Sequence, residues 1–315
     1  MKKRIFSLFS TGSILGFAFL FNTFSGFRSV MGNRLSLKNG HYYRWKYGNV
    51  YYSKCGTGTP LLLIHELLPT SSGEEWAESL RTLAEAHTVY TLDLPGCGRS
   101  DKPDLLYTQY FYDQMIVDFI SDIIQAPCDV MATGTSFSIA VMARKLDPSR
   151  FLHIIGVNPS PIEWTYRYPT VIHRLLRYIL MSPFAGTFIY NVSHCKFLVT
   201  NDMVKNAFYE PAKLKKETVD LYYRFAHYDH HLNKMLFSSM LTRFMNLDIR
   251  DGIRQGENLS IIAGEADEQG VHAAKACARM NGSVRVRRIQ KTKHLPQMEN
   301  PGLFCMTAEK LLTHK

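Results

Sequence analysis

The sequence predicts an α/β fold in which helices flank a mostly parallel central sheet. From Leu61 to Val157, short apolar stretches of strand length alternate with stretches whose apolar residues recur at helical spacing, which is typical of β–α–β units. Two more apolar stretches, Asn258–Ala263 and Val284–Ile289, indicate further strands near the C-terminus. Ahead of these units, residues 41–53 indicate an antiparallel hairpin that turns near Gly48.

A strand-to-helix junction around Ser136 is the first candidate for a functional site. The apolar stretch Cys128–Thr133 predicts a buried strand, and Phe137–Leu146 has apolar residues at helical spacing. Between them, Gly134 and Ser138 flank Ser136 with small side chains, which a strained turn that exposes a nucleophile requires. Ser138 stands where the second glycine of the G-x-S-x-G pattern would be, and a serine at a helix start is also a common N-cap.

Candidates for a catalytic acid and histidine follow the two C-terminal strands. Asp267 comes just after the first strand, with Glu265 and Glu268 close to it, and His294 comes just after the second. The carboxyl ends of parallel strands meet at one edge of a sheet, and catalytic groups collect at that edge. The chain order Ser136, Asp267, His294 therefore predicts a Ser–His–Asp triad.

Two further motifs have the same chain order as in a known family. Asp93-Leu-Pro-Gly-Cys-Gly-Arg-Ser100 follows a predicted strand, and Leu61-Leu-Leu-Ile-His-Glu-Leu-Leu-Pro69 combines a strand with an H-G-x-x-P-like turn, in which Glu66 stands in place of glycine. Together with the Ser136 junction and the two C-terminal strands, these motifs make the chain resemble the α/β-hydrolase fold family. The resemblance is to its serine-nucleophile branch, and it implies a helical cap over the catalytic edge.

The resemblance implies a serine hydrolase that acts on a carboxylic ester or a related carbonyl compound. His294 would take the proton of Ser136 as the serine attacks, and Asp267 would orient and stabilise the imidazole. Backbone N–H groups of Phe137 and of the Glu66–Leu67 turn would form the oxyanion hole. Water would then release the acyl group, and no cofactor would take part.

Two other functions remain open. One is a non-catalytic ligand-binding protein that keeps the fold, because fold alone does not establish activity. The other is a carbon–carbon bond hydrolase, because a serine can also attack a ketone carbonyl. In each case the partner would be a small and mostly apolar molecule. Its identity and the oligomeric state are not encoded in any readable motif.

The chain divides into a leader, a core and an insertion. We predict a leader at residues 1–40, a core at residues 41–158 and 255–315, and a helical cap at residues 159–254. The predicted cap interrupts the strand–helix alternation for too long to be a loop, and it has helical spacing at Val171–Met181 and Leu214–Phe225.

The leader predicts membrane association or export. It begins with three basic residues at positions 2–4, and Ile5–Phe24 contains no charged residue, so this segment is long enough to span a bilayer. A cleaved signal peptide would have the same layout, but the phenylalanines around Thr23 and Ser25 make a poor cleavage site. We therefore expect a single-pass anchor in preference to a signal peptide.

Composition excludes several other classes. The net charge is +10, but no nucleic-acid-binding motif accompanies the basic residues, so nucleic acid is not expected as a partner. The six cysteines are widely spaced and form no Cys/His ligand pattern, so no metal site is expected. Hydrophobic residues make up 46% of the chain, which is enough to bury one large core.

Overall fold

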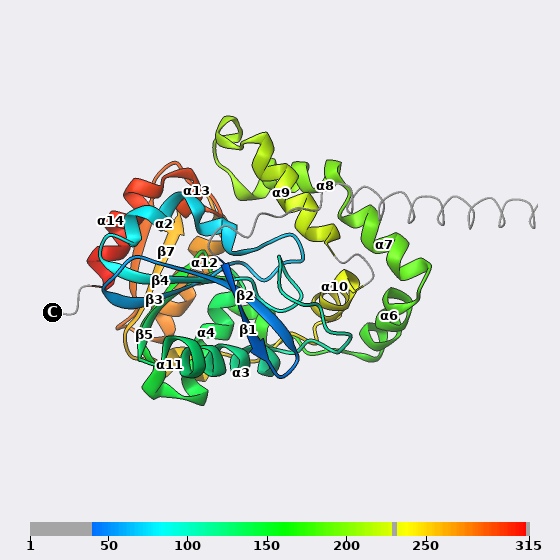
Figure 1. Ribbon diagram of the computed structural model, residues 1–315, viewed down its shortest axis with the longest axis horizontal. Helices are drawn as coiled ribbons and strands as arrows, with labels where there is room; N and C mark the ends of the chain where they lie inside the picture. Colours follow the sequence, from blue (N-terminus) through cyan, green and yellow to red (C-terminus); the bar gives the residue numbers. More distant parts are fainter. Residues whose placement is uncertain (1–39, 229–231, 313–315) are drawn as a thin grey trace, which may run out of the picture.

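An eight-stranded sheet forms the centre of the computed structural model, which describes residues 40–228 and 232–312 (Figure 1). The strand order is β1-β2-β4-β3-β5-β6-β7-β8. β1 and β2 form the predicted antiparallel hairpin and β2 pairs antiparallel with β4, whereas every later neighbouring pair is parallel. This topology confirms the predicted α/β class. The strands are β1 Gly40–Trp45, β2 Gly48–Cys55, β3 Thr59–Ile64, β4 His87–Leu92, β5 Cys128–Thr133, β6 Phe151–Val157, β7 Leu259–Gly264 and β8 Arg285–Ile289.

Helices cover both faces of the sheet because its inner strands are apolar on both sides. In β3, Leu61 and Leu63 join one buried cluster, and Leu62 and Ile64 join the other, as the two-residue period of a strand requires. The first cluster also contains residues of α2 Ala77–Leu83 and α14 Pro301–Leu312. The second contains residues of α3 Gln109–Phe119, α4 Ser136–Leu146, α11 Arg250–Arg254 and α12 Glu268–Met280.

The predicted elements around the junction agree with the observed ones to within one residue. β5 has the predicted bounds, α4 begins one residue earlier than predicted, and β7 and β8 each begin one residue later. β7 is buried along its whole length, whereas β8 is an edge strand with exposed arginines. Charged side chains on an edge strand discourage pairing with another chain.

Between β6 and β7 the described residues form helices and no strand. Figure 1 shows helices α6 to α10 beyond one end of the sheet. Helix α6 has the predicted bounds, and α9 begins and ends two residues later than the predicted helix. The exact limits of the predicted cap stay a prediction. The α-helices between β6 and β7 are α5 Ile162–Thr165, α6 Val171–Met181, α7 Ala185–Ser193, α8 Lys196–Asp202, α9 Lys216–His227, α10 Asn233–Leu241 and α11 Arg250–Arg254.

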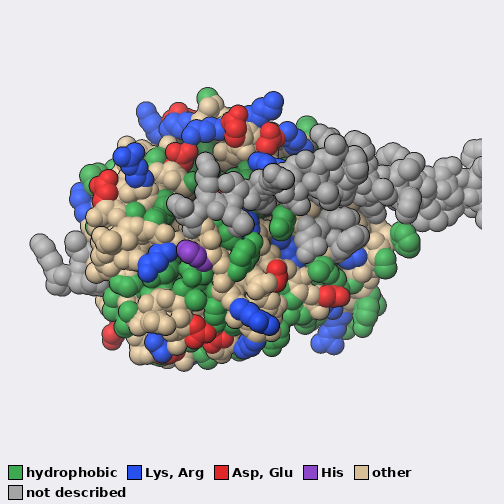
Figure 2. Space-filling model, viewed as in Figure 1, with side chains coloured by type: hydrophobic (Ala, Val, Ile, Leu, Met, Phe, Trp, Pro, Cys, Tyr) green, Lys and Arg blue, Asp and Glu red, His purple; other side chains and the backbone are tan. Residues whose placement is uncertain are grey.

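The predicted membrane segment, Ile5–Phe24, lies outside the described residues. Among the helices within residues 40–228 and 232–312, none combines the length and the hydropathy that a membrane-spanning helix needs. All six cysteines have free thiols, and Cys128 is buried in β5. On the face shown in Figure 2, Lys and Arg side chains are interspersed with Asp and Glu.

Candidate active site

The structure brings Asp267 and His294 together, as the sequence predicted. Asp267 follows β7 and caps α12, where its Oδ1 accepts the N–H of Gly270 at 2.9 Å. Its Oδ2 lies 2.8 Å from Nδ1 of His294, which follows β8. Glu265 and Glu268, the neighbouring acids, are exposed. Of these three acids, Asp267 is therefore the one that the carboxyl ends of β7 and β8 bring into hydrogen-bond contact with His294.

Asn158, at the end of β6, holds the two loops in this arrangement. Its Nδ2 donates to the carbonyl oxygens of Lys293 and His294 at 2.7 and 2.9 Å, and its Oδ1 accepts the N–H of Gly264 at 2.9 Å. Asn158 has a φ of +42°, in the left-handed region that asparagine tolerates better than most residues. It is a positioning residue that the sequence analysis did not identify.

The strained turn after β5 is centred on Gly134 and not on Ser136. β5 ends at Thr133 and α4 begins at Ser136, so only Gly134 and Thr135 form the turn. Gly134 has a φ of +54°, and its N–H donates to the carbonyl of Val157 in β6 at 2.9 Å. Glycine adopts this conformation at little cost, so the sharp change of direction occurs there.

Ser136 does not contact His294 in this structure, so only two of the three residues of the predicted triad, Asp267 and His294, meet. Ser136 is the first residue of α4, it is fully buried, and its Oγ donates to the carbonyl oxygen of His65 at 2.6 Å. Both ring nitrogens of His294 have other partners, Asp267 and Glu66. The physical reason is the position of the turn: two residues after Gly134 the chain is already helical, and the serine hydroxyl points to the end of β3.

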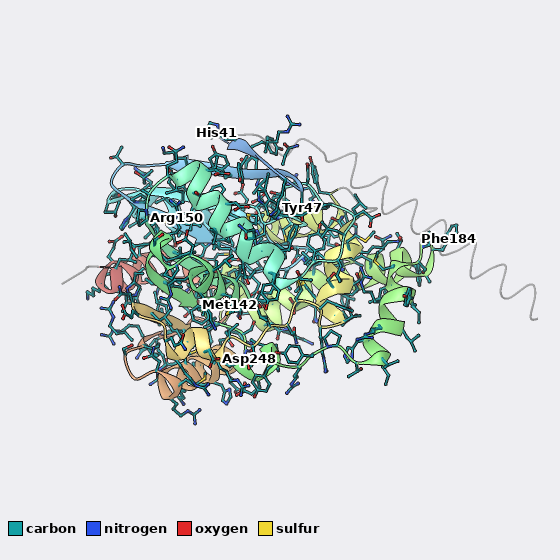
Figure 3. All side chains as sticks on the ribbon, turned by 90° about the horizontal axis from the view of Figure 1, so that it is seen from below. His41, Tyr47, Met142, Arg150, Phe184 and Asp248 are labelled. Atoms are coloured by element: carbon teal, nitrogen blue, oxygen red, sulfur yellow. The ribbon has the colours of Figure 1, made fainter. Side chains whose placement is uncertain are left out.

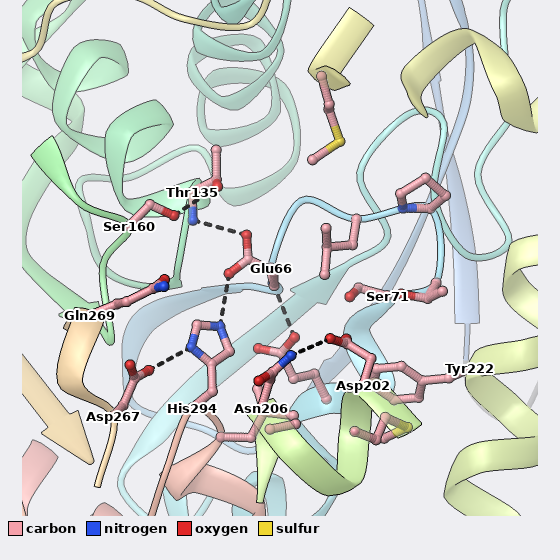
Figure 4. Close-up of a pocket in the computed structure, with 18 of the residues that line it drawn as sticks. Glu66, Ser71, Thr135, Ser160, Asp202, Asn206, Tyr222, Asp267, Gln269 and His294 are labelled. Carbon is pink, nitrogen blue, oxygen red and sulfur yellow. Dashed lines mark hydrogen bonds and ion pairs between the residues drawn. The ribbon is translucent and has the colours of Figure 1, made fainter. Parts of the chain in front are cut away.

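The side chain of Glu66 occupies the place that the prediction gave to the serine. Its Oε2 lies 3.1 Å from Nε2 of His294, and its Oε1 accepts the N–H of Thr135 at 3.0 Å (Figure 4). A Cβ atom built on Gly134 would lie 1.3 Å from this Oε2. A carboxylate oxygen from the end of β3 therefore fills the space where a side chain at position 134 would begin.

Two of the three predicted oxyanion-hole N–H groups have other partners. The N–H of Phe137 donates to the carbonyl of Gly134 at 3.3 Å, within the first turn of the helix. The N–H of Glu66 donates to Glu75 at 3.1 Å. The role of the Leu67 N–H stays a prediction, and the Leu67 side chain is buried in the core. The N–H of Thr135, which was not among the three predicted groups, donates to the Glu66 carboxylate.

The two carboxylates hold His294 in its protonated form. Burial lowers the pKa of His294, but the hydrogen bonds and charges of Asp267 and Glu66 raise it further, to about 10. Burial raises the pKa of Asp267, and its hydrogen bond to His294 more than offsets this, so the pKa lies below its usual value. At neutral pH both ring nitrogens of His294 therefore carry protons, and each donates to a carboxylate.

A second buried carboxyl group, that of Glu75, accepts a hydrogen bond from the backbone of Glu66. Glu75 is fully buried; its Oε2 accepts the Glu66 N–H and its Oε1 accepts Nε2 of Gln297 at 2.9 Å. Burial raises the pKa of Glu75 to about 7. His65 fixes the same turn, because its Nε2 accepts the N–H of Leu94 at 2.9 Å and its Nδ1 then donates to the Glu66 carbonyl at 2.6 Å.

A cavity of about 930 Å³ lies between the sheet edge and the cap helices, and it is lined by Glu66, Glu75, Thr135, Asp267 and His294. Figure 4 shows Glu66 between His294 and Thr135, with Asp202, Asn206 and Tyr222 of the cap opposite. The volume suits a drug-sized ligand. Among the described residues, no cluster of His, Cys, Asp and Glu side chains could hold a metal ion.

Sequence reasoning identified Glu66 only through its backbone and gave Gly134 only the role of a small neighbour of Ser136. Two signals were present. Ala132-Thr-Gly134-Thr-Ser136 also places small residues two positions before and after its centre, and glycine is the residue that enters the left-handed region most easily. A glutamate in place of the glycine of the β3 turn put a charged side chain at the same sheet edge.

Several solved structures share this fold. A serine hydrolase involved in carbazole degradation has a TM-score of 0.71 at 15% identity, over 87% of this chain and 98% of its own. A meta-cleavage product hydrolase from Pseudomonas fluorescens has a TM-score of 0.70 at 14% identity, over 88% and 98%. A membrane phospholipase A described as a bacterial virulence factor has a TM-score of 0.68 at 17% identity, over 99% and 98%. At these identities the likeness shows the fold alone.

Sequence comparison is more specific about the family. No curated protein gives a significant sequence match to this chain. The model of the alpha/beta hydrolase family, however, matches residues 61–306, from β3 to α14, and so covers the sheet edge with Glu66, Asp267 and His294. With most of the chain matched and the corresponding sheet and helices in place, this protein belongs to the alpha/beta hydrolase family.

Proposed function

We propose that this family member hydrolyses a small molecule bound in the cavity, with His294 and Asp267 as the pair that activates water. One observation carries the proposal: Asp267 fixes one ring nitrogen of His294, and the other nitrogen lies at the cavity beside Glu66. A histidine oriented in this way by a carboxylate is the usual general base for attack on a bound substrate.

The resting state sets a condition on this chemistry. A protonated imidazole cannot accept a proton, so His294 becomes a base only after Glu66 loses its charge or moves away. A substrate that enters between the two groups, or reacts with Glu66, would remove the contact that raises the pKa of His294. The proposal therefore couples substrate binding to activation of the base.

The serine hydrolase predicted from the sequence is the competing hypothesis. Membership of the family supports it, and it requires the Ser136 hydroxyl to leave the His65 carbonyl and to approach His294. A non-catalytic ligand-binding protein is a second alternative, which the absence of a serine contact to His294 favours. A carbon–carbon bond hydrolase is the third alternative, and like the serine hydrolase it requires the Ser136 hydroxyl to approach His294.

A substrate panel with two variants separates these hypotheses. The panel contains p-nitrophenyl esters of increasing chain length and styrene oxide, and a fluorophosphonate probe reports any activated serine. We expect turnover that His294→Ala abolishes and Ser136→Ala leaves nearly unchanged. The latter change removes only a buried hydrogen bond, so it should lower the free energy of unfolding by about 1 kcal/mol.

Two results would contradict this proposal. Probe labelling of Ser136 together with ester turnover would establish the serine mechanism. Binding of small esters without turnover of any panel member would establish the ligand-binding protein. Circular dichroism of both variants is the control for correct folding.

We also propose that the protein associates with a lipid membrane. The predicted segment Ile5–Phe24 is one reason, and α6 gives a second. The side chains at one face of α6 are apolar and more than half exposed, which is the layout of a helix that lies on a lipid surface. These residues are Val171, Ile172, Leu175, Tyr178 and Ile179. Figure 3 shows the cap end of the molecule, with Phe184 labelled just beyond α6.

Membrane washing and truncation test this location. We expect the full-length protein to stay in the membrane pellet after a high-salt wash, because salt weakens charge contacts but not an inserted helix. A chain that starts at Leu35 should be soluble and should still bind lipid vesicles weakly through α6. The double substitution Ile172→Ser with Ile179→Ser should lower this vesicle binding. Release of the full-length protein by salt would refute the anchor, and recovery of a shortened soluble protein would indicate a cleaved signal peptide.

A further inference from the structure

We propose that Glu66 is the nucleophile of this site and that its substrate is an epoxide, whose ring carbon forms an ester with the Glu66 carboxylate. This inference rests on the proposed hydrolase function and assigns the covalent step. It differs from the sequence-based triad in the attacking residue, in the strand that supplies it and in the kind of carbon attacked.

The first argument is the place of the carboxylate. Gly134, at the strained turn, has no side chain, and Oε2 of Glu66 lies where its Cβ would be. Glu66 comes from the end of β3, and β3 is the direct neighbour of β5 in the sheet. The site thus has an attacking oxygen at the turn, although the residue at the turn cannot supply one.

The second argument is the way the carboxylate is held. The Thr135 N–H, beside the start of α4, binds Oε1, and Oε2 is the oxygen next to His294. The Glu66 side chain is only 8% exposed, so little water competes for its charge. A partly desolvated carboxylate with one fixed oxygen and one oxygen at a cavity is suited to attack an electrophilic carbon.

The third argument is that protons and charges balance for an epoxide. Oε2 attacks a ring carbon, the carbon–oxygen bond of the ring breaks, and the released alkoxide takes the proton of the His294 imidazolium, directly or through a water molecule. Glu66 becomes a neutral ester and His294 becomes neutral in the same step. The loss of the Glu66 charge also removes a contact that held the proton on His294.

The second half of the reaction returns the site to its starting state. Neutral His294, still oriented by Asp267, takes a proton from water as the water oxygen attacks the ester carbonyl. The Thr135 N–H stabilises the charge that develops on Oε1. Collapse of this intermediate releases a diol and restores the Glu66 carboxylate and the His294 imidazolium. The sum is epoxide plus water to diol, with no other reactant.

A trapped intermediate tests the proposal directly. His294→Gln keeps the nucleophile and removes the base of the second step. It also removes the acid of the first step, so the alkoxide must take its proton from solvent water and ring opening is slower. Prolonged incubation with styrene oxide should therefore leave one ester adduct on Glu66. Mass spectrometry of the proteolysed protein locates it. The matched control is Glu66→Gln in the same background, which should give no adduct. Glu75 serves as an internal control, because it lines the same cavity but both its oxygens accept hydrogen bonds, from the Glu66 N–H and from Gln297.

An oxygen label gives a second measurement that uses the unmodified protein. Turnover of styrene oxide in H₂¹⁸O should place ¹⁸O in the Glu66 carboxylate, because water attacks its ester carbonyl, and should place none in Glu75. Epoxide turnover without label in Glu66 would overturn the nucleophile and leave the hydrolase intact. Ester turnover with neither adduct nor label would do the same, and failure of every panel substrate would overturn both proposals.

Discussion

Asp267→Asn should lower turnover of whichever panel substrate the protein hydrolyses by about four orders of magnitude. This is the effect expected when an oriented imidazole loses its carboxylate. Asp267 is the only side chain bonded to Nδ1 of His294 among the described residues, and an amide in its place would no longer hold the protonated ring. Steady-state kinetics measure the loss. Glu265→Gln, two residues away and exposed, is the matched control and should leave turnover unchanged.

The same variant should change the titration of His294. The pKa of His294 is raised to about 10 by both carboxylates, so removal of one should lower it by about 1–3 units. A raised pKa in the folded protein stabilises the fold fully at pH values below the unfolded pKa, and this contribution is lost as pH rises through the folded value. NMR of the His294 ring in the intact protein and in Asp267→Asn measures the shift; an unchanged pKa would show that Asp267 is not its partner in solution.

A serine grafted onto the turn should convert the site to a serine esterase. In Gly134→Ser with Glu66→Gly, the carboxylate that blocks the Cβ position is gone, and the new hydroxyl would lie beside a His294 that Asp267 still orients. We expect fluorophosphonate labelling at position 134. Hydrolysis of a p-nitrophenyl ester should exceed that of Glu66→Gly alone by at least about 100-fold, the lower range for an assisted nucleophile.

The single variants are the controls for this graft. Gly134→Ser alone should label poorly, because its Cβ would meet Oε2 of Glu66 at 1.3 Å until the glutamate side chain moves away. Serine at a φ of +54° should also lower stability by about 1–3 kcal/mol, which thermal unfolding measures. Strong labelling of the unmodified protein at Ser136, or an inert double variant that is correctly folded, would contradict the placement of the attacking group at the turn.

The sequence alone was sufficient to predict the fold and, within the site, the pair formed by Asp267 and His294. Apolar stretches of strand length determined the parallel sheet, because buried strands carry their signal in consecutive residues. Asp267 and His294 could be predicted for a related reason. Each follows a strand that is readable by itself, and the carboxyl ends of parallel strands must meet at one edge. The expectation that Asp267 and His294 lie close together therefore does not depend on the residues between β7 and β8.

Which side chain lies beside His294 at the turn was decided only by the tertiary structure. A shift of two residues in the turn exchanges Ser136 for Gly134, and local sequence allows either, because both have small neighbours. The choice depends on where β5 ends against β6 and on the space beside Gly134, which the side chain of Glu66, in the turn after β3, fills. The same side chain also contacts His294, which is 228 residues away in the sequence. Contacts between residues so distant in sequence leave no local pattern, so only the packed sheet edge could place the Glu66 carboxylate on His294.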